Sequence, residues 1–236
     1  MTKHSPIKAV IWDLSGVLTI EEELDDLEFP RQCGLSVENW RAIGRDYFID
    51  RQAWDRVERG EQTLGEFSET LSKLVSQYGG ECSPEKAGTI WGDPDPFTAS
   101  SGIRGDIINL IHSLRHQNTI CLCTNNIREW REIWESMIPV KELFHHVFDS
   151  SEIGQRKPET GFWRHMEEVL GLQPHEILFV DDRMNNVTGA RDHGWNAVQF
   201  LDSPSLIKAI SEFIEIEPIV AIPAHPAQDR GMEMSL

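Results

Sequence analysis

The stretch that decides the fold is AVIWDLSG, residues 9–16. Its unbroken apolar run predicts a buried β-strand that ends at an acid, Asp13. Gly16 permits a tight turn directly after that strand. A carboxylate at the end of a buried strand lies on the rim of a sheet, where α/β proteins carry out their chemistry. Taken alone, Asp13 could equally be a structural acid that accepts hydrogen bonds from backbone amides.

Later apolar runs repeat this pattern. Together with the first they predict five strands: Lys8–Asp13, Thr119–Thr124, His146–Asp149, Glu176–Asp181 and Asn196–Phe200. Helical stretches separate the later strands, and those over Glu159–Leu170 and Met184–His193 each stop at a glycine, the usual left-handed helix terminator. Alternation of strand and helix is typical of an α/β protein with a parallel, doubly wound sheet.

A long interval without strand patterning follows the first strand, roughly from Ile20 to Phe97. Apolar residues recur there at helical spacing, and Thr63 with Glu66 makes a capping-box pattern at the start of one helix. An all-helical insertion directly after the strand that carries Asp13 is expected to be a lid over that acid.

These patterns predict the domain organisation. Residues 1–19 and 98–215 are expected to form the core and residues 20–97 the helical cap, with DPDP (residues 93–96) as the return linker. Residues 216–236 contain several prolines and little periodicity, so we expect a flexible tail.

Charge narrows the range of partners. The 236 residues include 22 Lys and Arg against 39 Asp and Glu, a formal net charge of −17. This excess argues against nucleic acid or an anionic membrane as a partner, and an anionic substrate must be held by local cations and amide donors. The N-terminus is short and polar, and the sequence has no apolar stretch of transmembrane length, so we expect a cytoplasmic protein. We also expect a monomer or a homodimer.

The four cysteines do not suggest a disulfide framework. Cys121 and Cys123 alternate along one expected strand and point to the same face, which neither closes a good disulfide nor matches the usual C-x-x-C metal spacing. Buried free thiols are the favoured interpretation.

Two further segments offer groups that could bind a phosphate. Thr124 and Asn125 close the second strand, where a hydroxyl and amide donors can bind phosphoryl oxygens, although a helix N-cap is the more common role of these residue types. Lys157 lies just before a predicted helix and could neutralise both an attacking carboxylate and a phosphate. Its alternative is a solvated surface charge.

An acid pair, Asp181-Asp182, follows another buried strand. Adjacent acids at the end of a strand repel each other unless a cation joins them, so a hard metal ion such as Mg²⁺ is favoured. Together with Asp13, these segments suggest a magnesium-assisted phosphoryl-transfer site.

Taken together, these segments resemble the four motifs of the haloacid dehalogenase-like superfamily, whose members are mostly magnesium-dependent phosphatases. The likeness runs from about Lys8 to Phe213. It extends to ERGE (residues 58–61), GQRKPE (154–159) and FVDD (179–182), and continues through Asn186-Val187 and Gly189-Ala190. These stretches look like the subfamily that contains the phosphatase domain of soluble epoxide hydrolases and bacterial sugar-phosphate phosphatases. The resemblance implies a Rossmann-like core with a helical cap inserted after the first strand.

The resemblance also implies roles by position. Asp13 would be the nucleophile, Lys157 the charge clamp and a phosphate ligand, and Thr124 with Asn125 the remaining phosphate binders. For the metal, Asp182 would be the direct magnesium ligand and Asp181 its support. Asp13 and the backbone carbonyl of Ser15 would complete the metal site.

Ser15 departs from the family pattern, because active phosphatases usually have a second aspartate there. That aspartate protonates the leaving group and then activates water, and such acid–base help contributes typically about 10²–10⁴-fold. Its loss matters least for leaving groups that need little protonation, such as those of a sugar anomeric phosphate, an acyl phosphate or a diphosphate.

Three functions are consistent with the sequence. The favoured one is a magnesium-dependent phosphohydrolase that forms an aspartyl-phosphate on Asp13 and acts on a small organic phosphate or diphosphate. The second is an enzyme with the same core that processes isoprenoid diphosphates in specialised metabolism, for which Trp40, Trp54 and Trp91 in the cap give a hint, although core packing is their more common role. The third is a catalytically silent binding or scaffold module, suggested by Ser15.

Overall fold

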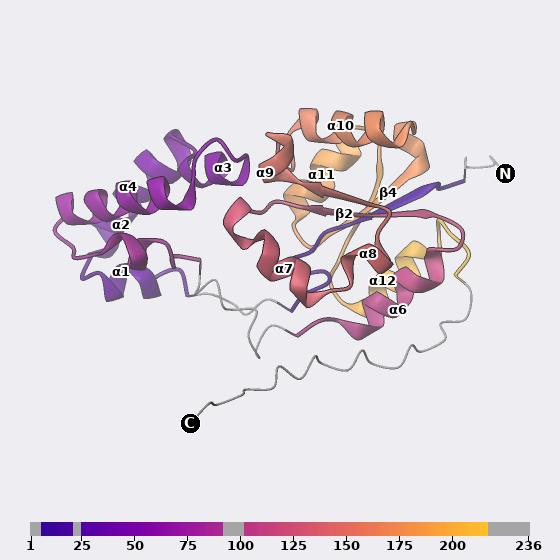
Figure 1. The fold of residues 1–236 in the computed structure, drawn as a ribbon, viewed down its shortest axis with the longest axis horizontal. Coiled ribbons are helices and arrows are strands. Elements are labelled where there is room, and N and C mark those ends of the chain that lie inside the picture. Colours follow the sequence, from indigo (N-terminus) through magenta and orange to yellow (C-terminus); the bar gives the residue numbers. More distant parts are fainter. Residues whose placement is uncertain (1–5, 21–24, 92–101, 217–236) are drawn as a thin grey trace, which may run out of the picture.

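A five-stranded sheet forms the centre of the computed structural model, which describes residues 6–20, 25–91 and 102–216 (Figure 1). The strands are β1 (Ala9–Trp12), β2 (Thr119–Thr124), β3 (His146–Asp149), β4 (Ile177–Asp181) and β5 (Asn196–Gln199). They lie in the order β3-β2-β1-β4-β5, and every neighbouring pair is parallel. The predicted α/β fold is confirmed, and each predicted strand end lies within one residue of the observed end.

Alternate residues of the strands enter separate apolar clusters on the two faces of the sheet. Val10 and Trp12 of β1 pack in one cluster and Ile11 in the other. Burial on both faces explains why these strands have continuous apolar sequences. The helices of the first face are α6 (Gly105–Leu114), α7 (Arg131–Met137), α8 (Val140–Leu143) and α12 (Ser203–Ile210), and those of the second face are α10 (Thr160–Leu170) and α11 (Met184–Asp192) (Figure 1).

Three short helices complete the core, and they connect its larger elements. They are η2 (Arg128–Trp130), α9 (Ser150–Ile153) and η3 (Pro174–Glu176). All four cysteines are free, and Cys121 and Cys123 are fully buried, as the sequence predicts. Among the described helices, none has the length and apolar character needed to cross a bilayer. The cytoplasmic location and the oligomeric state stay predictions.

Between β1 and α6, the described residues form a helical insertion, residues 25–91, on one side of the sheet (Figure 1). Its elements are α1 (Glu28–Gln32), α2 (Val37–Ile43), the π-helix η1 (Gly44–Asp50), α3 (Ala53–Glu58), α4 (Leu64–Gln77) and α5 (Pro84–Ala87). The predicted capping box begins α4, because the Thr63 hydroxyl accepts from the Glu66 amide at 3.1 Å and the Glu66 carboxylate accepts from the Thr63 amide at 2.9 Å. An apolar cluster forms in the insertion around Phe67 and Leu71, which are fully buried, and Ile127 and Trp130 join it from outside the insertion.

The entry and exit of the insertion run side by side. Thr19 forms an antiparallel bridge with Ile103, and the Ile20 amide donates to the Gly102 carbonyl at 2.8 Å. The expected linker at residues 93–96 lies outside the described residues, as does the expected tail from residue 217 onward. Ile216, which the sequence placed in that tail, packs instead against the core cluster of the first face.

Replacing Phe67 by alanine tests whether the insertion depends on its apolar cluster. Its ring contacts Tyr47 and Trp54 at centroid distances of 5.6 and 5.2 Å. Phe67→Ala should lower the free energy of unfolding by about 3–5 kcal/mol, because it leaves a cavity. Urea denaturation followed by far-UV circular dichroism measures this. The control Ile49→Ala, at a site 68% exposed, should stay within about 0.5 kcal/mol of the parent protein. Equal small losses in both variants would contradict the prediction.

Candidate active site

The candidate site residues meet at the carboxyl end of the sheet. Since β1 lies between β2 and β4 in a parallel sheet, Asp13, Thr124 and Asp181 leave the sheet at the same edge. The strand order reverses here, which is where doubly wound sheets bind their ligands. Lys157 reaches the same point from the loop before α10.

Lys157 is the buried cation of the site, with 1% of its surface exposed. Its Nζ lies 2.7 Å from both Asp13 Oδ1 and Asp181 Oδ2, and it donates to the Cys123 carbonyl at 3.3 Å. Burial alone would lower the pKa of Lys157, but the two carboxylates outweigh it and the pKa is raised. The ammonium group therefore stays charged, and the alternative of a solvated surface lysine is wrong.

The two carboxylates beside Lys157 differ in their electrostatics. Burial, and after it the charge of Asp181, raises the pKa of Asp13 well above its usual value, although Lys157 acts in the opposite direction. Burial would also raise the pKa of Asp181, but Lys157 and hydrogen bonds lower it overall. Asp181 accepts from the Arg183 amide at 2.8 Å and from Asn186 Nδ2 at 3.0 Å. These contacts fix the carboxylate and favour its ionised form.

Asn186 belongs to the stretch that carries the family resemblance, although the sequence analysis assigned it no role. It lies in the first turn of α11, five residues after Asp181, and its amide donates to both carboxylate oxygens of that acid, at 3.0 and 3.1 Å. The signal available in the sequence was this spacing, which returns a side chain near the start of a helix to the end of the preceding strand.

Three acids form a cluster with the geometry of a cation site. Asp13, Asp181 and Asp182 each offer a carboxylate oxygen, and these atoms lie within 4.8 Å of one another. Lys157 supplies one positive charge against three carboxylates, so the cluster retains negative charge. Clustered carboxylate oxygens are the donors that Mg²⁺ prefers. The residues of the cluster therefore fit a magnesium ion.

Gly16 allows Asp182 to approach the end of β1. A Cβ atom built on Gly16 would lie 2.6 Å from Asp182 Oδ2, and the glycine has a φ of +73°, a conformation that other residues rarely adopt. Ser15, between Asp13 and Gly16, is half-buried in the same turn. The turn that the sequence predicted from Gly16 thus also permits the close approach of Asp182.

The phosphate-binding candidates behave differently from one another. The Thr124 hydroxyl is buried and has no hydrogen-bond partner among the described residues. A buried hydroxyl without a partner costs stability, so this atom is suited to an oxygen of a ligand. The Asn125 side chain instead holds the backbone of Lys157, donating to its carbonyl at 3.0 Å and accepting from its amide at 2.8 Å. A contact of Asn125 with a phosphoryl group stays a prediction.

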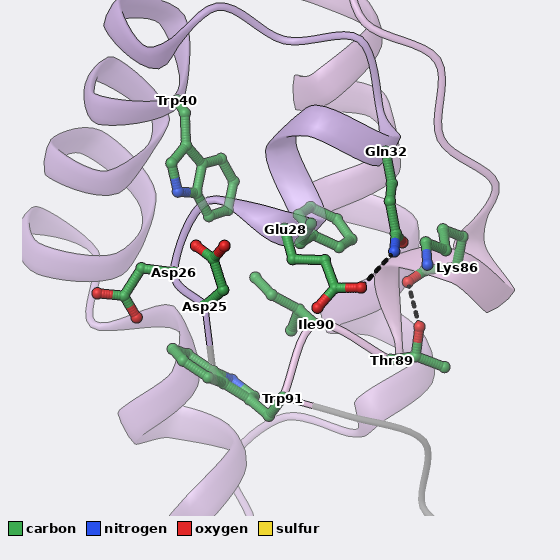
Figure 2. A pocket seen from close by; sticks show the side chains of 10 residues that line it. Asp25, Asp26, Glu28, Gln32, Trp40, Lys86, Thr89, Ile90 and Trp91 are labelled. Carbon is green, nitrogen blue, oxygen red and sulfur yellow. Dashed lines mark hydrogen bonds between the residues drawn. The ribbon is translucent and has the colours of Figure 1, made fainter. Parts of the chain in front are cut away.

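A cavity of about 520 Å³ lies within the helical insertion (Figure 2). Its apolar walls include Phe29, Ile90 and the indoles of Trp40 and Trp91, and acids of residues 25–28 line it as well. Trp54 is not part of this lining. Its ring packs between those of Trp91 in the insertion and Trp130 in the core, at centroid distances of 5.6 and 5.9 Å. Of the three tryptophans singled out in the sequence, two therefore line a cavity and the third joins the insertion to the core.

A parallel α/β sheet with a buried lysine, three acids and an unsatisfied hydroxyl at its carboxyl edge defines a class of enzymes, the hydrolases that act on phosphoryl groups. Over residues 7–194 the chain matches the haloacid dehalogenase-like hydrolases, and it belongs to this family. The family expected from the four motifs is confirmed.

Relatives within this family include phosphatases. The sesquiterpene phosphatase astK of Aspergillus oryzae is 28% identical over 207 residues, which is 83% of this chain and 91% of its own. Phosphoglycolate phosphatase of Escherichia coli is 24% identical over 222 residues, 84% of this chain and 82% of its own. A solved structure, a variant of a haloacid dehalogenase family enzyme from Bacteroides thetaiotaomicron in complex with magnesium and inorganic phosphate, matches with a TM-score of 0.63 at 20% identity, covering 85% of this chain and 98% of that one. The structural likeness shows the shared fold.

Removing the buried cation should destabilise the fold. In Lys157→Met, Asp13 and Asp181 face each other without a counter-charge, and breaking a buried pair in this way costs about 3–5 kcal/mol. Because the ionised form of Asp181 is favoured in the parent fold, its contribution to stability is present above its unfolded pKa and is lost as the pH falls through its folded pKa. The stability gap between parent and variant should therefore narrow in acid.

Urea denaturation in excess EDTA, from neutral to acidic pH, measures this gap. Lys208→Met, at an exposed position on α12, is the control and should change stability by less than about 0.5 kcal/mol. A gap that is small at neutral pH, or that widens in acid, would contradict the electrostatic role of Lys157.

Proposed function

We propose that this protein is a magnesium-dependent phosphohydrolase that forms an aspartyl-phosphate on Asp13. The observation that carries the proposal is the 2.7 Å contact between Asp13 and Lys157 at the end of β1, beside two further acids. In this proposal, residues 1–19 and 98–215 are the catalytic core and the helical insertion is a cap that extends over residues 20–97.

The proposed metal ligands are carboxylate oxygens of Asp13 and Asp182 and the backbone carbonyl of Ser15. Asp181 would support them, since hydrogen bonds already occupy both of its oxygens. When bound, the ion would neutralise phosphoryl oxygens that otherwise repel an attacking carboxylate. The relative crystallised with magnesium and inorganic phosphate supports this choice of ion.

The proposed chemistry has two displacements at phosphorus. A carboxylate oxygen of Asp13 attacks, the bond from phosphorus to the leaving-group oxygen breaks, and that oxygen leaves with the electron pair. Lys157 orients Asp13, and the Thr124 hydroxyl and Asn125 are proposed to bind the phosphoryl oxygens. Water then attacks the phosphorus of the aspartyl-phosphate and the bond from phosphorus to the Asp13 oxygen breaks. The electron pair returns to the Asp13 carboxylate, and the protons of the water leave on the inorganic phosphate.

Ser15 favours a diphosphate as the substrate. Without a carboxylate at this position, the leaving group must bear negative charge unaided. Attack on the terminal phosphorus of an organic diphosphate expels a phosphate monoester, which needs little protonation, whereas a simple alkyl monophosphate would expel an alkoxide. Substrates of the second kind depend most on the acid–base help, about 10²–10⁴-fold, that this chain lacks at residue 15.

An apolar alcohol is the proposed organic part of this diphosphate. The relative named a sesquiterpene phosphatase supports it. The cavity of about 520 Å³ in the insertion has two indoles in its lining, but acids line it as well and no residue of the candidate site does. The proposed substrates are therefore isoprenoid diphosphates. This proposal combines the first two functions considered from the sequence, a phosphohydrolase and an enzyme of specialised metabolism.

Ser15 also favours a second candidate, a catalytically silent module that binds magnesium and phosphate without turnover. The two candidates differ in one measurement. The silent module would bind both ligands, by isothermal titration calorimetry, yet release no phosphate from any member of a panel of sugar phosphates, acyl phosphates, nucleotides and prenyl diphosphates.

Asp13→Asn should abolish phosphate release while leaving the far-UV circular dichroism spectrum unchanged, because the amide cannot act as the nucleophile. Phosphate release from that panel, with Mg²⁺ and with excess EDTA, measures this. EDTA should abolish activity in the parent protein. Asp192→Asn, at an exposed position on α11, is the control and should retain activity. Full activity in EDTA, or in Asp13→Asn, would overturn the mechanism.

The diphosphate preference should be visible in the products. With farnesyl diphosphate, we expect one equivalent of inorganic phosphate and accumulation of farnesyl monophosphate, resolved by liquid chromatography. Across a series of aryl phosphates, the rate of the first step should fall steeply as the leaving-group pKa rises, because residue 15 supplies no proton. Faster cleavage of the monophosphate than of the diphosphate, or a flat dependence on leaving-group pKa with this step limiting, would contradict the role given to Ser15.

A further inference from the structure

Ion pairs join the helical insertion to the loop that carries Lys157. In some of them the arginine comes from the core, and in another it comes from the insertion. From the core, Arg156 pairs with Glu58 of α3 at 2.5 Å and with Asp55 at 2.8 Å. From the insertion, Arg59 pairs with Glu159 of the core at 2.8 Å. Each side therefore gives one arginine and receives the arginine of the other.

The Arg156–Glu58 pair is shielded from water, with side chains 18% and 9% exposed. In the other two pairs the arginines are 18% and 11% exposed and the acids, Asp55 and Glu159, are 32% and 34% exposed. By contrast, the Arg51–Asp46 pair within the insertion has side chains 58% and 43% exposed. Removing one partner of an ion pair that is shielded from solvent lowers the free energy of unfolding more than removing one partner of an exposed pair.

Glu58 is the central acid of this contact. Burial raises its pKa, while the neighbouring Arg156 acts to lower it. The Trp54 indole donates to Oε1 of Glu58 at 3.0 Å, and Oε2 forms the ion pair with Arg156 without a hydrogen bond among the described residues. The carboxylate is thus held between an indole of the insertion and a guanidinium of the core.

The contact reaches the catalytic lysine through the loop backbone. Glu159, which pairs with Arg59, also accepts from the Arg156 amide at 3.1 Å. The next residue is Lys157, whose backbone is held from the other side by Asn125. One short loop therefore connects the position of the insertion to the position of the Lys157 ammonium group.

The backbone at the end of α3 is shaped for this contact. A Cβ atom on Gly60 would lie 2.4 Å from the Ser151 carbonyl oxygen, and the glycine has a φ of +67°. Any other residue here would push α3 away from α9, beside which it lies (Figure 1). Leu64 adds a further contact, since its amide donates to the Glu129 carboxylate of the core at 2.8 Å.

We propose that Arg156 is a positioning residue. Its pairing with Glu58 and Asp55 holds the insertion closed on the core, and this closure sets the orientation of Lys157 between Asp13 and Asp181. The kinetic part of this inference rests on the proposed phosphatase function, whereas the closure itself does not.

The Leu64 amide offers a readout of closure that needs no turnover. Leu64 is the first residue of α4, where an amide has no partner within its own helix, so its protection from hydrogen exchange depends on Glu129 across the interface. In Arg156→Gln and in Glu58→Gln, exchange of this amide, measured by NMR, should accelerate by about tenfold or more through opening of the contact. The Val75 amide, inside α4, should keep its rate and so report that the insertion stays folded.

Two further variants make the comparison specific. Arg51→Gln, which breaks an exposed pair within the insertion, should leave Leu64 exchange unchanged. In the double variant of Glu58→Gln and Arg156→Gln, the acceleration should be smaller than the product of the two single effects, because both changes break the same pair. Unchanged Leu64 exchange in both single variants would overturn the closure, whether or not the protein is active.

Kinetics test the positioning. With p-nitrophenyl phosphate and Mg²⁺, Arg156→Gln should lower kcat by about tenfold, while inhibition by inorganic phosphate changes less than about threefold. Arg156→Lys, which keeps the charge but not the planar fork, should fall between the parent and Arg156→Gln. An unchanged kcat despite faster Leu64 exchange would overturn the positioning role.

The series of aryl phosphates, applied to these variants, separates Glu58 from a role as proton donor. If Glu58→Gln alone steepened the dependence on leaving-group pKa and Arg156→Gln did not, Glu58 would act on the leaving group and the inference would be wrong. A parent protein without phosphatase activity would refute the proposed function, and the exchange experiment would still decide the closure.

Discussion

The site depends on one buried ammonium group. Two carboxylates at the ends of adjacent strands, Asp13 and Asp181, can stay together away from water because Lys157 lies 2.7 Å from each. In a chain with a net charge of −17, the overall field repels anions, so attraction for a phosphoryl group must come from such local charges and donors. The remaining arrangement follows from it: Asn125 fixes the loop that delivers this lysine, and Asn186 fixes the acid that holds it.

The sequence predicted the sheet well for a physical reason. Strands buried on both faces need uninterrupted apolar residues, and the acids that end β1 and β4 mark the edge where they stop. Parallel pairing then brings those ends together, so Asp13, Thr124 and Asp181 could be assigned to one place before their geometry was known. The spacing of apolar residues and the capping box at Thr63 predicted that the insertion is helical.

What the sequence could not supply is the choice of long-range polar partners. Nothing in the local pattern distinguishes Arg156, which is shielded and paired across the interface, from an exposed arginine such as Arg51. The ERGE stretch that contains Glu58 carries the family resemblance but no assigned role, although the Glu58 carboxylate is buried against the core. Asn125 shows the same limit, because an amide at a strand end can bind a ligand or a neighbouring loop, and here its side chain binds the loop. Such partners are set by how the elements pack, which periodicity does not encode.

The side-by-side entry and exit of the insertion, at Thr19 and Ile103, has an evolutionary consequence. Two chain segments that cross the same narrow neck place little restriction on how many residues lie beyond it, and insertions are best tolerated where their ends are close. The helices beyond the neck can be lengthened, shortened or repacked without moving β1 or the acid at its end. Selection for new substrates can therefore act on the parts of the insertion that do not contact the Lys157 loop, while the acids and the lysine of the core are inherited unchanged.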